Sequence, residues 1–80
     1  MNDATLFAVI RVMGEYPTQD AANEVLCCFC QKQRQIIALD NGLWRAGVVI
    51  SVHLAMDTAV RRLYEQCMGR GDGLYVAEPL

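Results

Sequence analysis

The chain has 80 residues, of which 54% are hydrophobic and 20% are charged, and its formal net charge at pH 7 is −2. A chain of this length forms one domain at most, so the whole of residues 1–80 is expected to be a single domain. Its interior is too small to hide so many apolar side chains, which favours self-association or a partner. The negative charge argues against a protein that coats nucleic acid.

No secretory signal is visible near the start of the chain. The early apolar segment is interrupted by Arg11 and lacks a basic start and a small-residue cleavage site. No apolar run reaches the roughly 18 residues of a membrane-spanning helix. A membrane-surface helix needs a basic polar face, whereas the one lysine is Lys32. We therefore expect a cytoplasmic protein that binds no membrane, with its cysteines reduced.

Apolar spacing predicts two helices in the first half of the chain. Apolar side chains recur at three- and four-residue spacing over residues 3–14, and Gly14 and Pro17 are suited to ending that helix. Thr18 is expected to cap a second helix, over residues 18–39, in which the helical period continues.

The dipeptide Asn41-Gly42 allows two structures. It can close a hairpin between strands at 35–39 and 43–50, or it can end one helix and precede another. The spacing of Val49, Val52 and the apolar residues that follow is near heptad, so we favour a third helix over residues 44–68.

The sequence thus predicts an all-α domain of three helices with a long third helix. Residues 69–80 are expected to form a short extended tail in which Glu78 and Pro79 fray. Val52→Asp should place an unpaired charge in the core or in an interface and cost several kcal/mol. The predicted core comprises Leu6, Ile10, Val25, Leu26, Phe29, Ile36, Val52, Met56, Val60 and Leu63.

His53 and the cysteines are the candidate catalytic or metal-binding residues. His53 could act as a general base or a metal ligand, but the sequence assigns it no catalytic partner, so a polar contact within an interface is favoured. Together with Cys27, Cys30 and Cys67 it matches a zinc ligand set by count. On one helix, however, His53 and Cys67 would lie about 21 Å apart. We therefore expect buried thiols, no metal ion, no cofactor and no enzymatic activity.

The favoured function is that of a non-enzymatic regulator, of the inhibitor, antirepressor or co-regulator type. It would bind another protein through an apolar helical surface and form a homodimer. The alternative is a helix-turn-helix or winged-helix DNA-binding regulator that reads DNA with the polar residues 31–35. The predicted interface residues are Trp44, Val48, Val49, Val52, His53, Met56, Arg61 and Arg62.

Two segments in the second half carry a resemblance to a known family. Gly42-Leu43-Trp44-Arg45-Ala46 is a Gly-Leu-Trp-Arg-type turn into a helix, and Arg61-Arg62-Leu63-Tyr64-Glu65-Gln66-Cys67 is a basic stretch that ends in an aromatic residue and a cysteine. In both segments the chain resembles the PerC-like small regulators of enterobacteria and their phages. The resemblance implies a role in transcription control through a protein partner, and it implies no catalytic residue. For the favoured function, a transcription regulator is one possible protein partner.

Overall fold

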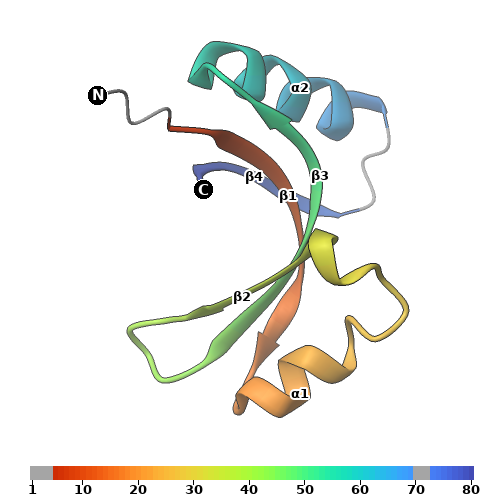
Figure 1. The fold of residues 1–80 in the computed structure, drawn as a ribbon, viewed down its shortest axis with the longest axis vertical. Coiled ribbons are helices and arrows are strands. Elements are labelled where there is room, and N and C mark those ends of the chain that lie inside the picture. Colours follow the sequence, from red (N-terminus) through yellow and green to blue (C-terminus); the bar gives the residue numbers. More distant parts are fainter. Residues whose placement is uncertain (1–4, 70–72) are drawn as a thin grey trace.

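The structure, a computed structural model, describes residues 5–69 and 73–80. It is an α+β fold built on a four-stranded antiparallel sheet in the order β2-β3-β1-β4 (Figure 1). The order of the main elements is the split β-α-β arrangement of ferredoxin-like domains. The prediction of an all-α, three-helix domain is therefore wrong. The elements are β1 (Phe7–Tyr16), α1 (Gln19–Glu24), the 3-10 helix η1 (Gln31–Gln33), β2 (Arg34–Ala38), β3 (Trp44–His53), α2 (Met56–Gly69) and β4 (Leu74–Pro79).

The two central strands occupy the places of predicted helices. β1 replaces the helix expected over 3–14, and β3 replaces the first half of the helix expected over 44–68. Ala8, Val9 and Ile10 are each fully buried, because β1 is a central strand with β3 on one side and β4 on the other. Such a strand shows a continuous apolar run without alternation, which cannot be told from a buried helix by periodicity.

The turn before β3 is a hairpin, so the interpretation that we set aside at Asn41-Gly42 is correct. The Leu39 N–H donates to the Leu43 carbonyl (2.8 Å), and the Gly42 N–H donates to the Leu39 carbonyl (3.1 Å). Gly42 has φ +86°, a left-handed conformation that glycine adopts without a steric penalty. The loop therefore consists of Asp40, Asn41 and Gly42, one residue longer than the two-residue form that we considered.

The helix expected over residues 18–39 is present only as α1. Thr18 does cap it, since its side-chain oxygen accepts from the Ala21 N–H at 3.1 Å. After α1 the chain turns, keeps Leu26 fully buried against the sheet and then pairs β2 with β3. Arg34 holds the turn by donating from Nε to the Phe29 carbonyl at 3.0 Å. Pairing with β3 provides hydrogen-bond partners for the backbone of β2. It also places Ile36 against the buried cluster.

The second half of the long predicted helix is confirmed as α2, which ends at Gly69, one residue beyond the prediction. The segment predicted to be a docked tail is instead β4, paired along β1, and the Leu80 N–H adds a bond to the Leu6 carbonyl at 2.8 Å. Within residues 5–69 and 73–80, no helix has the length and apolar character that crossing a membrane requires.

The sheet is bent, and both helices lie on its outer side. β1 and β3 curve through their middle, with α1 beside the lower half and α2 beside the upper half (Figure 1). The register of these strands shifts between Val9 and Ile10 and again between Val12 and Gly14. Such bulges bend a strand and increase its twist. Gly47 lies on the inner side of the bend, where Ile10 packs directly over it.

Some residues of the predicted core are buried and others are exposed. Ile10 and Leu26 are fully buried as expected, whereas Leu6, Val52 and Val60 are exposed. Val52 lies on the inner side of the sheet, which neither helix covers, opposite the fully buried Ala8. Leu26 belongs to a buried cluster under α1 that also contains Ala22, Ala46 and Val48.

Candidate interaction surface

The inner side of the bent sheet is the most distinctive surface of the molecule. Residues opposite each other in neighbouring strands share a face, and both helices lie on the other face (Figure 1). We call the inner side the open sheet face. An open face of an antiparallel sheet is normally polar, yet this one is largely aliphatic. Ala8 and Ile10 lie at its base and are fully buried, whereas Val52 and Leu74 are exposed. The residues of this face come from all four strands: Ala8, Ile10, Val12, Glu15, Gln35, Ile37, Arg45, Val49, Val52, Leu74, Val76 and Glu78.

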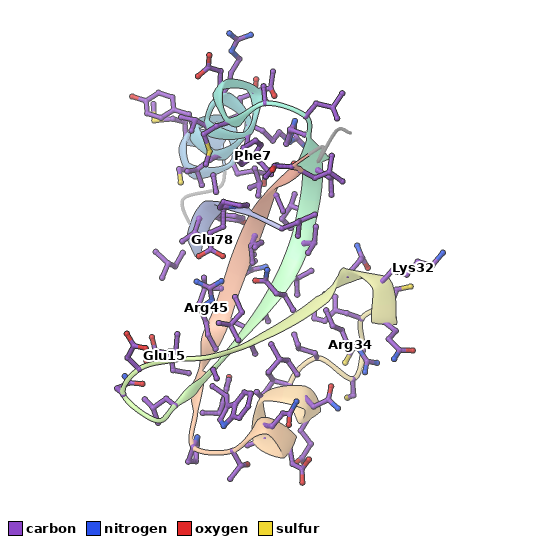
Figure 2. All side chains as sticks on the ribbon, turned by 60° about the vertical axis from the view of Figure 1, so that its left-hand side comes forward. Phe7, Glu15, Lys32, Arg34, Arg45 and Glu78 are labelled. Carbon is purple, nitrogen blue, oxygen red and sulfur yellow. The ribbon has the colours of Figure 1, made fainter. Side chains whose placement is uncertain are left out.

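One ion pair crosses the open sheet face. Arg45 donates from Nη1 and Nη2 to the two carboxylate oxygens of Glu78, at 2.8 and 2.7 Å. Its Nη2 also donates to Oε1 of Gln35 at 3.1 Å. Along β1, Arg45 stands opposite Glu15 and Glu78 opposite Ala8, so the two side chains start far apart on a flat sheet. The bend brings them together (Figure 2), and the paired geometry is the strong, bidentate form of this contact.

The pair shifts the pKa values of both partners. The hydrogen bond from Arg45 lowers the pKa of Glu78 from its ordinary value, while partial burial opposes the change. The hydrogen bond to Glu78 raises the pKa of Arg45. The Arg45 and Glu78 side chains are 13% and 31% exposed, so solvent screens the contact in part. The buried Nε of Arg45 has no hydrogen-bond partner among the described residues.

We expect Glu78→Gln to reduce the acid sensitivity of folding. A lowered pKa means that Glu78 contributes fully above its ordinary value of 4.5 and that this contribution disappears as the pH falls through the lower pKa of the folded chain. The wild type should be more stable than Glu78→Gln by about 1 kcal/mol at neutral pH, and this difference should disappear as the pH falls through the pKa of Glu78 in the folded chain.

Urea unfolding at several pH values measures this difference. Glu24→Gln is the control, because Glu24 is exposed and lies outside both proposed contact surfaces, so its charge should contribute little. Parallel stability curves for the wild type and Glu78→Gln would contradict the role assigned to the pair.

The predicted interface residues do not come together in one surface. Val49 and Val52 lie on the open sheet face. Trp44 and Val48 lie on the covered face, where Val48 is buried and Trp44 packs against the same cluster.

The remaining predicted residues are at or after the end of β3. His53 is its last residue. Met56 is half-buried in the first turn of α2, whereas Arg61 and Arg62 are exposed on that helix. The residues of the predicted surface therefore divide between both faces of the sheet and α2.

His53 has a partner that sequence reasoning missed. Its Nε2 lies 2.8 Å from Oγ of Ser51. Two residues apart in a strand share a face, so the spacing would have found this pair if β3 had been recognised. The described residues surround no pocket in which a substrate could meet it.

The cysteines are placed differently from our expectation. All four thiols are exposed, whereas we predicted buried thiols. Cys27, Cys28 and Cys30 lie in the turn between α1 and η1, and Cys67 lies on α2. Among residues 5–69 and 73–80, no three His, Cys, Asp or Glu side chains lie close enough to share a metal ion.

Sequence reasoning also missed the contribution of β4. It assigned Glu78 to a fraying tail, although the alternation of Leu74, Val76 and Glu78 with their neighbours fits one face of a strand. No protein-family model, curated protein or solved structure matches this chain. We therefore infer its function from its own surfaces.

Proposed function

We propose that this protein is a small, non-enzymatic, cytoplasmic regulator that acts by binding another protein on its open sheet face. The observation that carries this proposal is a set of half-buried and exposed aliphatic side chains from all four strands, which neither helix covers and one ion pair crosses. They are Val12, Ile37, Val49, Val52, Leu74 and Val76. An apolar centre with polar groups around it is the usual anatomy of a protein interface. The proposed binding surface is a sheet and not the predicted helix, because most of the predicted interface residues belong to β3.

The shape of the face favours a convex partner. The sheet bends toward its open side (Figure 1), and an amphipathic helix is the common convex element that lays an apolar stripe on such a surface. Val49 and Val76 flank Ile10 at the centre of the face and would meet the apolar stripe of that helix. The PerC-like resemblance supports a transcription regulator as the protein that supplies it.

The residues of the DNA-binding alternative lie in elements other than the expected helix. The polar residues 31–35, expected to lie on a recognition helix, form η1 and the start of β2. Lys32 and Arg34 lie near each other there (Figure 2), but Arg34 donates to the backbone carbonyls of Phe29 and Cys27. We therefore do not propose direct reading of DNA.

Val52→Asp tests the binding surface. Val52 is 48% exposed, so the substitution should lower the free energy of unfolding by less than about 1 kcal/mol. This is much less than the core placement predicted. A charge on the face should nevertheless abolish binding, because an apolar partner leaves the carboxylate desolvated and unpaired.

The measurement is affinity capture from the source cell with tagged wild type, Val52→Asp and Leu54→Asp. Leu54 is 79% exposed and follows the end of β3, so it supplies a matched apolar-to-charged control. We expect the same proteins on the wild type and on Leu54→Asp, with at least a roughly tenfold loss on Val52→Asp. Equal capture by all three variants would contradict the proposed surface.

A further inference from the structure

The helix α2 carries more apolar surface than the sheet covers. Ala59 is fully buried against the sheet and Leu63 is half-buried. Val60, Tyr64 and Met68 are 47%, 69% and 75% exposed. These three residues are spaced by four, so they lie one above another along one flank of the helix. We call them the outer stripe.

Two opposite charges run beside the outer stripe. Arg61 follows Val60 and Glu65 follows Tyr64 in the sequence, and both are exposed. They are also four residues apart, so they form a parallel row one position farther around the helix. A row that holds one positive and one negative charge is complementary to the same row of a second, antiparallel copy.

A single two-fold axis aligns these charges between two copies. An α-helix rises about 1.5 Å per residue, so with the axis at the level of Leu63, Arg61 lies about 3 Å to one side and Glu65 about 3 Å to the other. Because a two-fold axis reverses the helix direction, Arg61 of each copy is level with Glu65 of the other. Two symmetric charge pairs result.

The same axis makes the apolar residues interdigitate. Val60 lies about 4.5 Å from the level of the axis, while Tyr64 and Met68 of the second copy lie about 1.5 and 7.5 Å away on that side. Val60 is therefore level with the gap between them, which is how the ridges of one helix fill the grooves of another. Charge and shape point to one register.

We propose that a second copy of this chain docks on the outer stripe, α2 antiparallel to α2, and forms a homodimer. The helix has 14 residues and is about 21 Å long, so the contact is smaller than a standard interface of about 1,600 Å². We expect a weak dimer, with a dissociation constant on the order of micromolar. Because α2 lies on the side of the sheet away from the open sheet face (Figure 1), the dimer leaves that face free and does not depend on the function proposed for it.

A charge-swap series tests this interface. Arg61→Glu and Glu65→Arg each replace two attractive contacts by two repulsive ones, and we expect each to raise the dissociation constant at least tenfold. The double variant Arg61→Glu/Glu65→Arg restores both contacts and should return the dissociation constant to within about threefold of the wild type. Sedimentation velocity from about 1 to 500 μM measures these constants, and circular dichroism verifies that each variant is folded.

Two controls separate this surface from its neighbours. Arg62→Glu alters the other arginine of α2, which pairs with Glu65 of its own chain at 3.3 Å and lies outside the facing row, so the dimer should persist. Val52→Asp should also leave the dimer intact. A loss of partner binding at the open sheet face can therefore be distinguished from a loss of the dimer. A wild type that is monomeric at every concentration, or single variants that dimerise normally, would overturn the proposal. Failure of the double variant to restore the dimer would overturn it as well.

Discussion

Replacing Gly47 by alanine is expected to lower the free energy of unfolding by about 2–3 kcal/mol. A Cβ atom at this position would lie 2.6 Å from Cγ2 of Ile10, far inside the contact distance of about 3.5–4 Å. Ile10 is fully buried, and its branched side chain is stiff at χ1, so this methyl group cannot move aside freely. A chain of this size has only about 0.05–0.15 kcal/mol of stability per residue, so the loss is a large share of the whole.

A double-mutant cycle attributes the loss to this contact. Ile10→Ala alone should cost about 2–4 kcal/mol by leaving a cavity. In the Gly47→Ala background, the same change also removes the clash. The double variant should therefore lose less stability than the sum of the losses of the two single variants. Gly69→Ala is the control, because no atom of the described residues outside its own surroundings lies within 4 Å of its added Cβ. Additive costs in urea unfolding would show that Ile10 is not the obstacle.

Leu26→Ala is expected to cost about 3 kcal/mol. Leu26 is fully buried and, with Ala22, forms the part of the core that α1 and the following turn contribute. α1 has six residues, too few for a helix that is stable without tertiary contacts. Removing the Leu26 side chain therefore loosens this whole segment in addition to leaving a cavity.

Hydrogen exchange would detect that loosening. The amide of Phe29, which donates to the Leu26 carbonyl at 2.9 Å, and the amide of Ala22, which donates to the Thr18 carbonyl at 3.2 Å, should exchange faster through local opening. Leu54→Ala supplies the comparison, since that side chain is exposed and its loss should change neither stability nor exchange. A cost below about 1 kcal/mol for Leu26→Ala would mean that the segment is held by other contacts.

Gly47 and Ile10 are connected to the proposed binding surface, whereas Leu26 is not. Gly47 and Ile10 form the inside of the bend, and the bend brings Arg45 to Glu78. A variant that changes the bend should therefore alter the open sheet face along with stability, whereas Leu26→Ala acts on the opposite side of the sheet.

The mistaken helix prediction has a specific cause in the bulges. Ala8 and Ile10 share a face of β1, and their partners in β3 are Val52 and Val49. The bulge thus puts Val49 and Val52 on one face at a spacing of three, which is the spacing of a helix rather than of a strand. The bulge near Met13 has the same effect in β1, where Val12 and Glu15 share a face.

The sequence by itself determined the features that depend on a few neighbouring residues. These are the cap at Thr18, the turn that Asn41-Gly42 permits and the end of α2 near Gly69. Each follows from the conformational preferences and hydrogen bonds of a short segment.

Only the tertiary structure decided what lies between these points. The sheet pairs β1 with β3 and β4, strands far apart in sequence. Such pairing overrides local periodicity because it satisfies backbone groups and buries Ala8, Val9 and Ile10 of the central strand β1. The same pairing gathers distant aliphatic residues and the Arg45–Glu78 pair on one open face, since the side on which a strand residue lies depends on the register of its neighbours.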